Sequence, residues 1–285
     1  MQSTERYFAN GKTAGVASHE KEYLLATGAK AVERLRLLDQ IFGPASRQLL
    51  IRAGLPSTHR VVEIGCGTGL MALWMAGQLG PEGALSAVDS SKAQLEVAAE
   101  NARAAGLQNV SFFASAAEHT RLPRGSFDLV YSRFLMCHLT NPLVVLREMS
   151  DVLRPGGALV CEDFEMSAVG TRPQTDAYRR LIEVSRAVDR QRGIDSDIGA
   201  KLHTLFSEAG YKDPKVAVYE PAFLRGEAKR FWAITLREAE SAIVAGGIEG
   251  TDRIHSICND LERIAKDDSV LVLIARVFQV WARKA

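Results

Sequence analysis

The stretch Val61–Gly69, with the sequence VVEIGCGTG, decides the fold of this chain. A short β-branched run ends in three glycines at positions 65, 67 and 69, and the apolar segment Leu70–Leu79 follows directly. Glycine adopts positive φ and allows a ligand to approach the backbone closely. A strand that turns into a helix through such a loop presents free amide groups to a ligand. The sequence therefore predicts a strand–loop–helix unit with a binding site at its turn.

The spacing of these glycines separates two classes of ligand. Loops that bind dinucleotides follow G-x-G-x-x-G over a pyrophosphate, but here Leu70 stands where the third glycine would be. Glu63 precedes the first glycine by two residues. A carboxylate is unfavourable beside a pyrophosphate and favourable beside a cationic amino group. A nicotinamide oxidoreductase is therefore disfavoured, and a ligand with an amino group is favoured.

Strands and helices alternate on both sides of this unit. The predicted strands are Arg60–Ile64, Gly83–Asp89, Val110–Ala114, Phe127–Ser132, Ala158–Asp163, Lys215–Tyr219 and Ala275–Trp281. The predicted helices between them are Leu70–Leu79, Ser91–Ala105, Pro142–Leu153 and Ser196–Ala209. Such alternation indicates a doubly wound, seven-stranded, mostly parallel sheet with helices on both faces.

The segment before the first strand is expected to be helical. Glu20–Phe42 carries apolar residues at helical spacing. We expect Gly43-Pro44 to end this helix, with Pro44 opening a second helix to about Gly54. Residues 1–54 are thus predicted to form an arm and helices that cover the active site.

The segment between the last two strands is predicted to be a helical insert. Residues 226–266 are largely helical in pattern, and a short helix is expected at Val270, before the last strand. An insert at this point lies over the carboxyl ends of the sheet, where ligands bind in open α/β folds. We therefore expect one main domain, residues 55–285, with a helical lid at 226–266.

Composition and charge argue against several classes of protein. The 285 residues carry a net charge of +1 without a long basic run, which disfavours a nucleic-acid partner. Four separated cysteines without a CxxC pair favour reduced thiols. The sequence shows neither metal-ligand spacing nor an apolar run of about 20 residues. We expect no metal and no membrane partner, in a cytoplasmic monomer or homodimer.

The E-x-G-x-G-x-G pattern of Glu63–Gly69 resembles motif I of class I S-adenosylmethionine (SAM) dependent methyltransferases. Asp89 after the second strand, FDLVYS at 127–132 and LRPGG at 153–157 resemble later signatures of that family, in the same order. The resemblance is strong over residues 55–165 and extends to the flanking helices of bacterial small-molecule members. It implies a Rossmann-like methyltransferase fold, SAM as cofactor and S-adenosylhomocysteine (SAH) as product.

The resemblance also implies a set of cofactor-binding residues. Asp89 is placed to hold both ribose hydroxyls, although a strand-end cap is the alternative reading. The backbone of Ala116 and Ala117 is placed at the adenine edge, and the Tyr23 hydroxyl near the cofactor carboxylate. The full set is Tyr23, Glu63, Gly65, Cys66, Gly67, Asp89, Ser90, Ala116, Ala117, Ser132 and Arg133.

Two residues are candidates for catalysis. His138 follows the fourth strand, and a histidine there can orient substrate or take a proton; a structural or cofactor-side role stays open. Glu162, at the end of the fifth strand with Asp163, can accept a proton or bind a cationic substrate. The alternative for both carboxylates is pairing with an arginine such as Arg133, or capping a turn.

These features predict transfer of a methyl group to an oxygen, nitrogen or carbon atom of a small, natural-product-like molecule. Phe231 and Trp232 in the insert either line an aromatic acceptor pocket or belong to the core of the insert. The competing functions are a methyltransferase of RNA or protein, and a SAM-binding protein without transfer activity.

Overall fold

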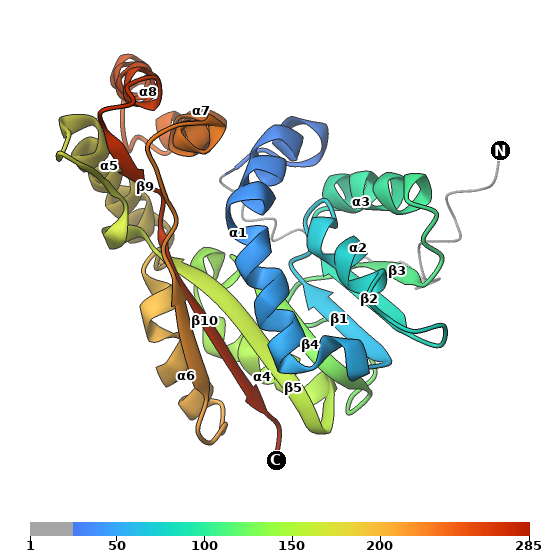
Figure 1. The fold of residues 1–285 in the computed structure, drawn as a ribbon. Helices are drawn as coiled ribbons and strands as arrows, with labels where there is room; N and C mark the ends of the chain where they lie inside the picture. The colour runs from blue at the N-terminus through green and yellow to red at the C-terminus, as the bar shows by residue number, and fades with distance from the viewer. Residues whose placement is uncertain (1–24) are drawn as a thin grey trace.

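A seven-stranded sheet forms the centre of the protein, whose computed structural model describes residues 25–285 (Figure 1). The strand order is β3-β2-β1-β4-β5-β10-β7. The strands are β1 (Arg60–Ile64), β2 (Ala84–Asp89), β3 (Val110–Ala114), β4 (Phe127–Arg133), β5 (Leu153–Glu165), β7 (Lys215–Tyr219) and β10 (Arg276–Arg283). Strands β1–β5 pair in parallel, and β10 is antiparallel to both β5 and β7. The predicted mostly parallel sheet is confirmed.

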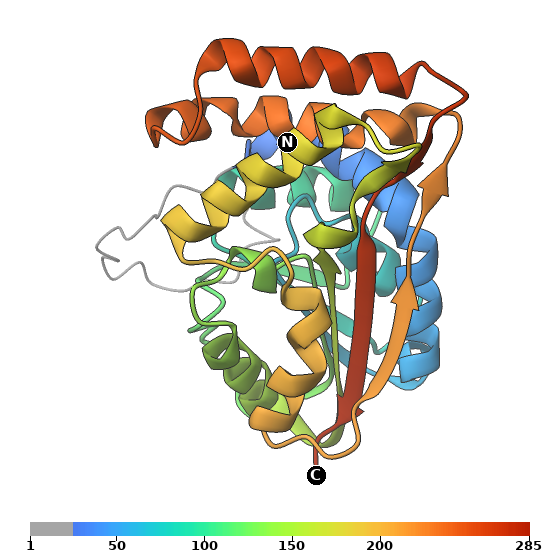
Figure 2. The ribbon, with the colours of Figure 1, turned by 90° about the vertical axis from the view of Figure 1, so that its left-hand side faces the viewer.

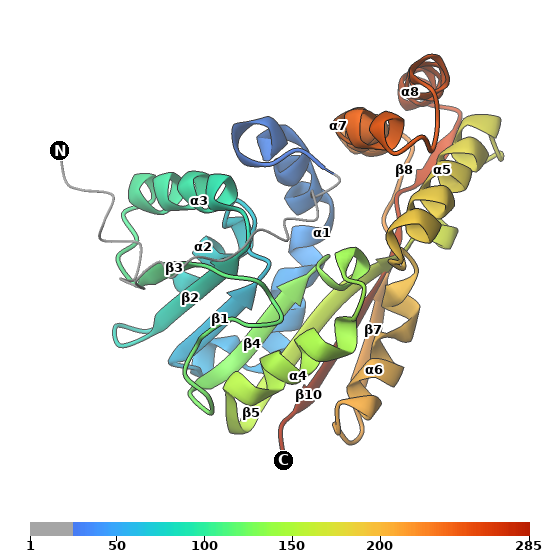
Figure 3. The ribbon, with the colours of Figure 1, turned by 180° about the vertical axis from the view of Figure 1, so that it is seen from behind.

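Helices cover both faces of this sheet. One face carries α1 (Val32–Ala53), α2 (Leu70–Ala76) and α3 (Lys92–Ala104), and the other carries α4 (Pro142–Val152) and α6 (Leu202–Glu208) (Figures 1 and 3). Buried side chains such as Leu49, Leu95 and Val160 fill the first interface. Buried apolar side chains of α4 and α6 fill the interface on the second face of the sheet in the same way. The order reverses at β1, and ligands bind outside the carboxyl ends of strands at such a reversal.

Helix α1 shows that one prediction was wrong: it continues through Gly43 and Pro44 to Ala53 instead of ending there. Proline removes a backbone donor and typically costs about 3 kcal/mol inside a helix. Burial on both sides offsets this cost, since Leu37 and Ile41 pack into one apolar cluster and Leu49 into another. The helix therefore links two parts of the core across its proline.

A cap of three helices lies beyond the carboxyl ends of the parallel strands (Figure 2). It consists of α5 (Asp176–Arg192), α7 (Phe231–Ala245) and α8 (Thr251–Ala265). A small sheet of order β6-β9-β8 joins the cap to the main sheet; its strands are β6 (Gly170–Arg172), β8 (Ala222–Phe223) and β9 (Leu271–Leu273). The cap has its own apolar cluster, to which the first half of α1 contributes.

Two further expectations need correction. The segment after Val270 is strand β9, not a short helix, because it pairs with β6 and β8. Strand β5 begins at Leu153, so the Pro155–Gly157 turn lies within it, at an irregularity in its pairing with β4. Helix α5 and the small sheet were not predicted. Over residues 25–285, no helix is both long and apolar enough to cross a membrane.

Candidate functional site

The glycine loop after β1 folds back onto the end of β2. Gly65, Gly67 and Gly69 all have positive φ, at 79°, 53° and 80°. The amides of Gly65 and Cys66 donate to the Val88 carbonyl at 2.8 and 3.0 Å. A Cβ atom at Gly69 would stand 2.9 Å from that of Ala98 on α3, so the close approach requires glycine. The loop is thus a rigid turn at the reversal of strand order.

Asp89 ties this loop to the start of α3. One carboxylate oxygen accepts from the Gly67 amide at 2.8 Å and the other from the Ser91 amide at 2.9 Å. Burial raises the pKa of Asp89, and the hydrogen bonds from Ser91, Gly67 and Ser90 oppose the rise. The neighbouring Ser90 is exposed. Asp89 is a strand-end cap, as the alternative reading had it, and each oxygen retains a lone pair for a further donor.

Glu63 lies at the base of the loop and is only 3% exposed. Its Oε2 atom has no hydrogen-bond partner among residues 25–285. Burial raises the pKa of Glu63 to about 8, against the opposing influence of Arg133. A buried acceptor without a donor is costly, and a cationic amino group at the loop would satisfy it. This unpaired acceptor therefore fits the amino group of SAM, which would donate to it.

The adenine side of the predicted site is a turn after β3. The Ser115 amide donates to the Asp89 carbonyl at 3.1 Å, and the His119 amide donates to the Ala116 carbonyl at 3.2 Å. Ala116 is exposed and Ala117 half-buried. The structure thus ties the start of this turn to the end of β2 at Asp89, and the contact of the two alanines with adenine stays a prediction.

The first turns of α1, and the 3-10 turn before them, approach the glycine loop and the start of α3. The Gly28 amide, in the 3-10 turn Gly28–Ala31, donates to Gln94 Oε1 of α3 at 3.3 Å. A Cβ atom at Gly67 would lie 3.8 Å from Leu35 Cδ1. Tyr23, predicted to contact the cofactor, lies outside the described residues.

The chain leaving β4 closes the other side of the loop. Phe134 has a φ of 54°, which is strained for a bulky side chain. Its amide donates to the Glu162 carbonyl at 2.9 Å. Leu135 Cδ1 lies 3.1 Å from the position of a Cβ atom at Gly65. Residues 134–135 therefore lie directly against the loop.

The side chains of Ser132 and Arg133 are engaged elsewhere. Ser132 Oγ donates to Cys161 Sγ of β5 at 3.4 Å. Arg133 donates to Asp39 Oδ1 at 3.1 Å and to Ser46 Oγ at 3.2 Å, both on α1. Both side chains are thus directed to β5 and α1 by these bonds. Arg133 pairs with Asp39 rather than with Glu162 or Asp163.

Glu162 is enclosed beneath α1, not placed at an open rim as expected. It is 2% exposed. Its Oε1 accepts from the Tyr131 hydroxyl at 2.6 Å, and its Oε2 accepts from Gln279 Nε2 at 2.5 Å. Burial raises its pKa, and Arg133 opposes the rise. With both oxygens occupied, the carboxyl group is placed to hold β4, β5 and β10 together.

Asp163, the neighbour of Glu162, holds the segment after β4. It accepts from the Cys137 amide at 3.2 Å and from the Phe164 amide at 2.9 Å. Burial raises the pKa of Asp163 to about 7. This carboxyl group fixes the 3-10 turn Met136–His138.

His138 stands at the carboxyl end of β4, in that 3-10 turn, and is half-buried. Burial lowers its pKa to about 4, and the positive charges of Arg34 and Arg192 contribute. The imidazole is therefore neutral at physiological pH. It is a hydrogen-bonding group and a weak base in this setting.

Residues 61–157 match a family model described as a methyltransferase domain. Methyltransferase GfsG of Streptomyces halstedii is 37% identical over 119 residues, 41% of this chain and 42% of its own length. Residues 61–157 form a methyltransferase domain. The demethylmenaquinone methyltransferase of Listeria welshimeri is 35% identical over 123 residues, 43% of this chain and 52% of its own length. The chain thus spans about half the length of these curated relatives.

A solved structure shows the same fold for the methyltransferase domain and its flanking parts. A putative methyltransferase from Bacillus halodurans superposes with a TM-score of 0.58, at 18% identity, over 84% of this chain and 97% of its own. At this identity the likeness shows the fold alone. The Rossmann-like methyltransferase fold is confirmed.

The aromatic residues predicted in the insert belong to the cap above the methyltransferase domain. Phe231 and Trp232 are buried, and Trp232 Nε1 donates to the Ile274 carbonyl at 2.6 Å. Their role as core of the insert is the one that the structure shows. Phe134 and Phe164, with ring centroids 5.7 Å apart, are only half-buried below them.

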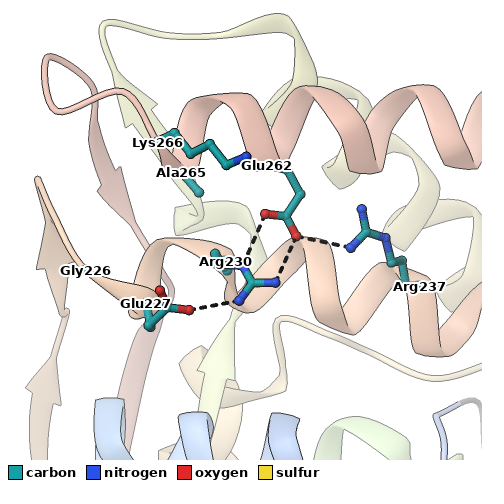
Figure 4. A pocket seen from close by; sticks show the side chains of 7 residues that line it. All are labelled: Gly226, Glu227, Arg230, Arg237, Glu262, Ala265 and Lys266. Carbon is teal, nitrogen blue, oxygen red and sulfur yellow. Dashed lines mark hydrogen bonds and ion pairs between the residues drawn. The ribbon is translucent and has the colours of Figure 1, made fainter.

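A hollow of about 540 Å³ lies between α7 and α8 of the cap, away from the glycine loop (Figure 4). Its charged side chains satisfy one another: Arg230 pairs with Glu227 and Glu262, and Arg237 pairs with Glu262. In the described part of the chain, no three His, Cys, Asp or Glu side chains gather as metal ligands would. The expectation of no metal stays a prediction.

Sequence reasoning missed Arg34, Asp39 and Arg192, which surround the domain's predicted site. Arg34 and Asp39 lie on α1 and Arg192 ends α5. The signal available for the first two was a charged residue inside an amphipathic helical stripe. Nothing comparable marked Arg192, because α5 itself was not predicted.

Proposed function

We propose that the protein transfers the methyl group of SAM to an oxygen, nitrogen or carbon atom of a small, natural-product-like molecule. The observation that carries this proposal is Glu63 Oε2, a buried acceptor without a donor among the described residues, at the base of the glycine loop. A ligand with a cationic amino group satisfies it, and Asp89, at the end of β2, accepts from the Gly67 amide of this loop and has lone pairs left for ribose hydroxyls.

In this proposal the residues align the reactants more than they exchange protons. SAM supplies a methyl group already activated on a sulfonium, so orientation of the acceptor provides much of the rate. Glu63 would bind the amino group, Asp89 the ribose, and the backbone of Ala116 and Ala117 the adenine edge. Tyr23 stays the candidate for the cofactor carboxylate.

His138 would orient the acceptor or take its proton. A neutral imidazole can accept a hydrogen bond from a hydroxyl or amine. With a pKa of about 4 it suits an acceptor that loses its proton easily. Glu162 is proposed as a positioning residue, because Tyr131 and Gln279 hold both of its oxygens.

The small-molecule class rests on the cap and on the names of relatives. The cap lies over the carboxyl ends of the strands, where it would enclose a small acceptor (Figure 2). The relative named demethylmenaquinone methyltransferase acts, by that name, on a small molecule. We extend the proposal to a cytoplasmic monomer or homodimer. A methyltransferase of RNA or protein, or a SAM-binding protein without transfer, are the competing functions.

Calorimetry and a labelled-methyl assay test this proposal together. SAM and SAH should bind with micromolar affinity and NAD should not; tight binding of NAD without SAM would overturn the cofactor assignment. Incubation with methyl-labelled SAM and a panel of phenols, amines and enols should label one class of acceptor. Labelling of RNA or protein alone would overturn the small-molecule assignment, and binding without any transfer would favour the non-catalytic alternative.

A further inference from the structure

The guanidinium group of Arg34 is buried with part of its donor capacity unused. Arg34 is 3% exposed, and its Nε donates to Glu238 Oε2 of α7 at 2.7 Å. Its Nη2 atom is buried without a hydrogen-bond partner among residues 25–285. Buried polar groups are normally satisfied, and an orphan in a native fold requires an explanation. A ligand whose acceptor atom receives a hydrogen bond from Nη2 would explain it.

Arg34 lies where the proposed acceptor would enter. The next residue on α1, Leu35, approaches Gly67 of the glycine loop, while Glu238 belongs to the cap. Figures 1 and 2 show the first turns of α1 and helix α7 together beyond the carboxyl ends of the strands. The guanidinium therefore links α1, the helix that approaches the cofactor loop through Leu35, to α7 of the cap.

The charges that face this region are mostly positive. Arg34 and the Arg192 side chain, from the last turn of α5, both act on His138. Glu238 is the carboxylate bonded to Arg34, and it receives only the Nε donor. Asp163, which fixes the turn that contains His138, accepts from the amides of Cys137 and Phe164 with its two carboxylate oxygens. Two arginines thus act on the neutral imidazole of His138, and one of them, Arg34, is bonded to Glu238 through Nε alone.

We propose that the acceptor of the methyl group carries an anionic group, a carboxylate or a phosphate, and that Arg34 binds it between α1, α7 and His138. This proposal rests on the proposed function, since it names the class of acceptor for that site. A guanidinium presents planar donors that match such anions. The half-buried rings of Phe134 and Phe164 offer an apolar surface below, so we expect an aromatic or other flat body attached to the anion.

Three probes of one shape test the proposal: benzoate and phenyl phosphate, which are anionic, and neutral benzamide. They are titrated into the SAH-loaded protein and followed by intrinsic tryptophan fluorescence and calorimetry. At least one anion should bind ten times more tightly than benzamide, which corresponds to about 1.4 kcal/mol. The stronger anion distinguishes carboxylate from phosphate. Equal affinities, or no binding of any probe up to its solubility, overturn the proposal.

Variants assign the effect to Arg34. Arg34→Met should abolish the preference for the anion, while Glu238→Gln should tighten anion binding, because it removes the competing carboxylate. The control is Arg237→Met, which removes an arginine of α7 that pairs with Glu262 of α8; it should leave the anion preference unchanged. An unchanged anion preference in Arg34→Met, or weaker anion binding in Glu238→Gln, overturns the assignment.

Folding and cofactor binding are checked separately. Arg34→Met leaves Glu238 without its partner, so the double variant Arg34→Met/Glu238→Gln serves as the second test and should also lose the anion preference. Thermal unfolding verifies that each variant is folded. SAH affinity is measured first, and the probe titrations are repeated without SAH. Failure of SAH to bind the wild-type protein counts against the proposed function, whereas a wild-type protein that binds SAH normally and shows no preference for the anionic probes counts against this inference alone.

Discussion

At the scale of single residues, the site depends on carboxyl groups whose partners differ. Glu63 is buried with one oxygen that has no donor among the described residues, Asp89 is half-buried and accepts from two amides, and Glu162 is 2% exposed and accepts from two side chains. These environments suit different roles, because a buried oxygen without a donor and the half-buried oxygens of Asp89 can take a ligand, whereas those of Glu162 are enclosed. The sequence places all three at strand ends and does not distinguish them.

Glu63 should couple SAM binding to release of a proton. Its pKa is about 8, raised by burial and by Asp39 and Asp89 against Arg133, so the carboxyl is mostly protonated at pH 7 without ligand. Binding a cationic amino group favours the charged form. Affinity should therefore rise with pH and level off above about 8. Calorimetry in buffers of different ionisation enthalpy should detect the proton, and Glu63→Gln should abolish it. Equal apparent enthalpies in all buffers would contradict this.

The raised pKa of Glu63 also makes the free energy of unfolding depend on pH. The pKa of Glu63 is higher in the folded state than its ordinary value of 4.5, so the folded state binds the proton more tightly. Its contribution to stability is therefore present below pH 4.5 and is lost as the pH rises to about 8. Glu63→Gln should make the free energy of unfolding less dependent on pH in this range.

Asp89→Ala should weaken SAM binding at least tenfold, about 1.4 kcal/mol. The variant removes the proposed ribose contact and frees the Gly67 and Ser91 amides. Asp128→Ala is the matched control, because Asp128 also accepts from two backbone amides, those of His59 and Arg60, at the other end of β1. Calorimetry compares the two. A dissociation constant unchanged in Asp89→Ala would remove its assigned role.

His138→Ala should lower turnover while SAM affinity stays nearly the same. Because the pKa of His138 is about 4, its neutral form dominates throughout the physiological range, and the wild-type rate should show no inflection from this group above about pH 5. His255→Ala, on the exposed side of α8, is the control and should be inert. Equal activity of His138→Ala and the wild type would contradict the proposed role of His138 in orienting the acceptor or taking its proton.

At the scale of elements, α1 is the decisive feature. It crosses from the cap to the sheet, and Pro44 sits in its middle at an exposed position. A proline costs a helix about 3 kcal/mol, so Pro44→Ala should raise the free energy of unfolding by about 1–3 kcal/mol in chemical denaturation. Gly43→Ala should raise the free energy of unfolding by less, because its Cβ atom would stand 2.5 Å from Arg47 Nη1 and 2.7 Å from Asp39 Oδ1. A stability loss in Pro44→Ala would contradict this reading.

At the scale of the whole molecule, much of the sheet was predictable from sequence. Arg60–Ile64 and Val110–Ala114 are strands with the bounds predicted, because buried parallel strands are short β-branched or aromatic runs between turn residues. The continuity of α1 was not predictable, since it depends on burial at both of its ends. The enclosure of Glu162 depends on Gln279, which is distant in sequence and meets it through the β5–β10 pairing.

Hydrogen exchange tests whether cofactor binding protects the start of α1 together with the glycine loop. SAH should slow exchange of the loop amides at 65–69 and of the start of α1, which approaches them at Leu35 and Gly67. Helix α8, on the far side of the cap, should change little. Protection that spares α1 would contradict its proposed place in the cofactor site.

The sheet order has a consequence for biosynthesis. Strand β10 lies between β5 and β7, yet it is the last of the seven strands to leave the ribosome. Until then β5 has an unpaired edge, and β7 has no partner in this sheet. Unpaired edges are templates for aggregation, and pairing of distant segments slows folding. Nascent chains that stop short of residue 276 should therefore depend on chaperones that shield β5.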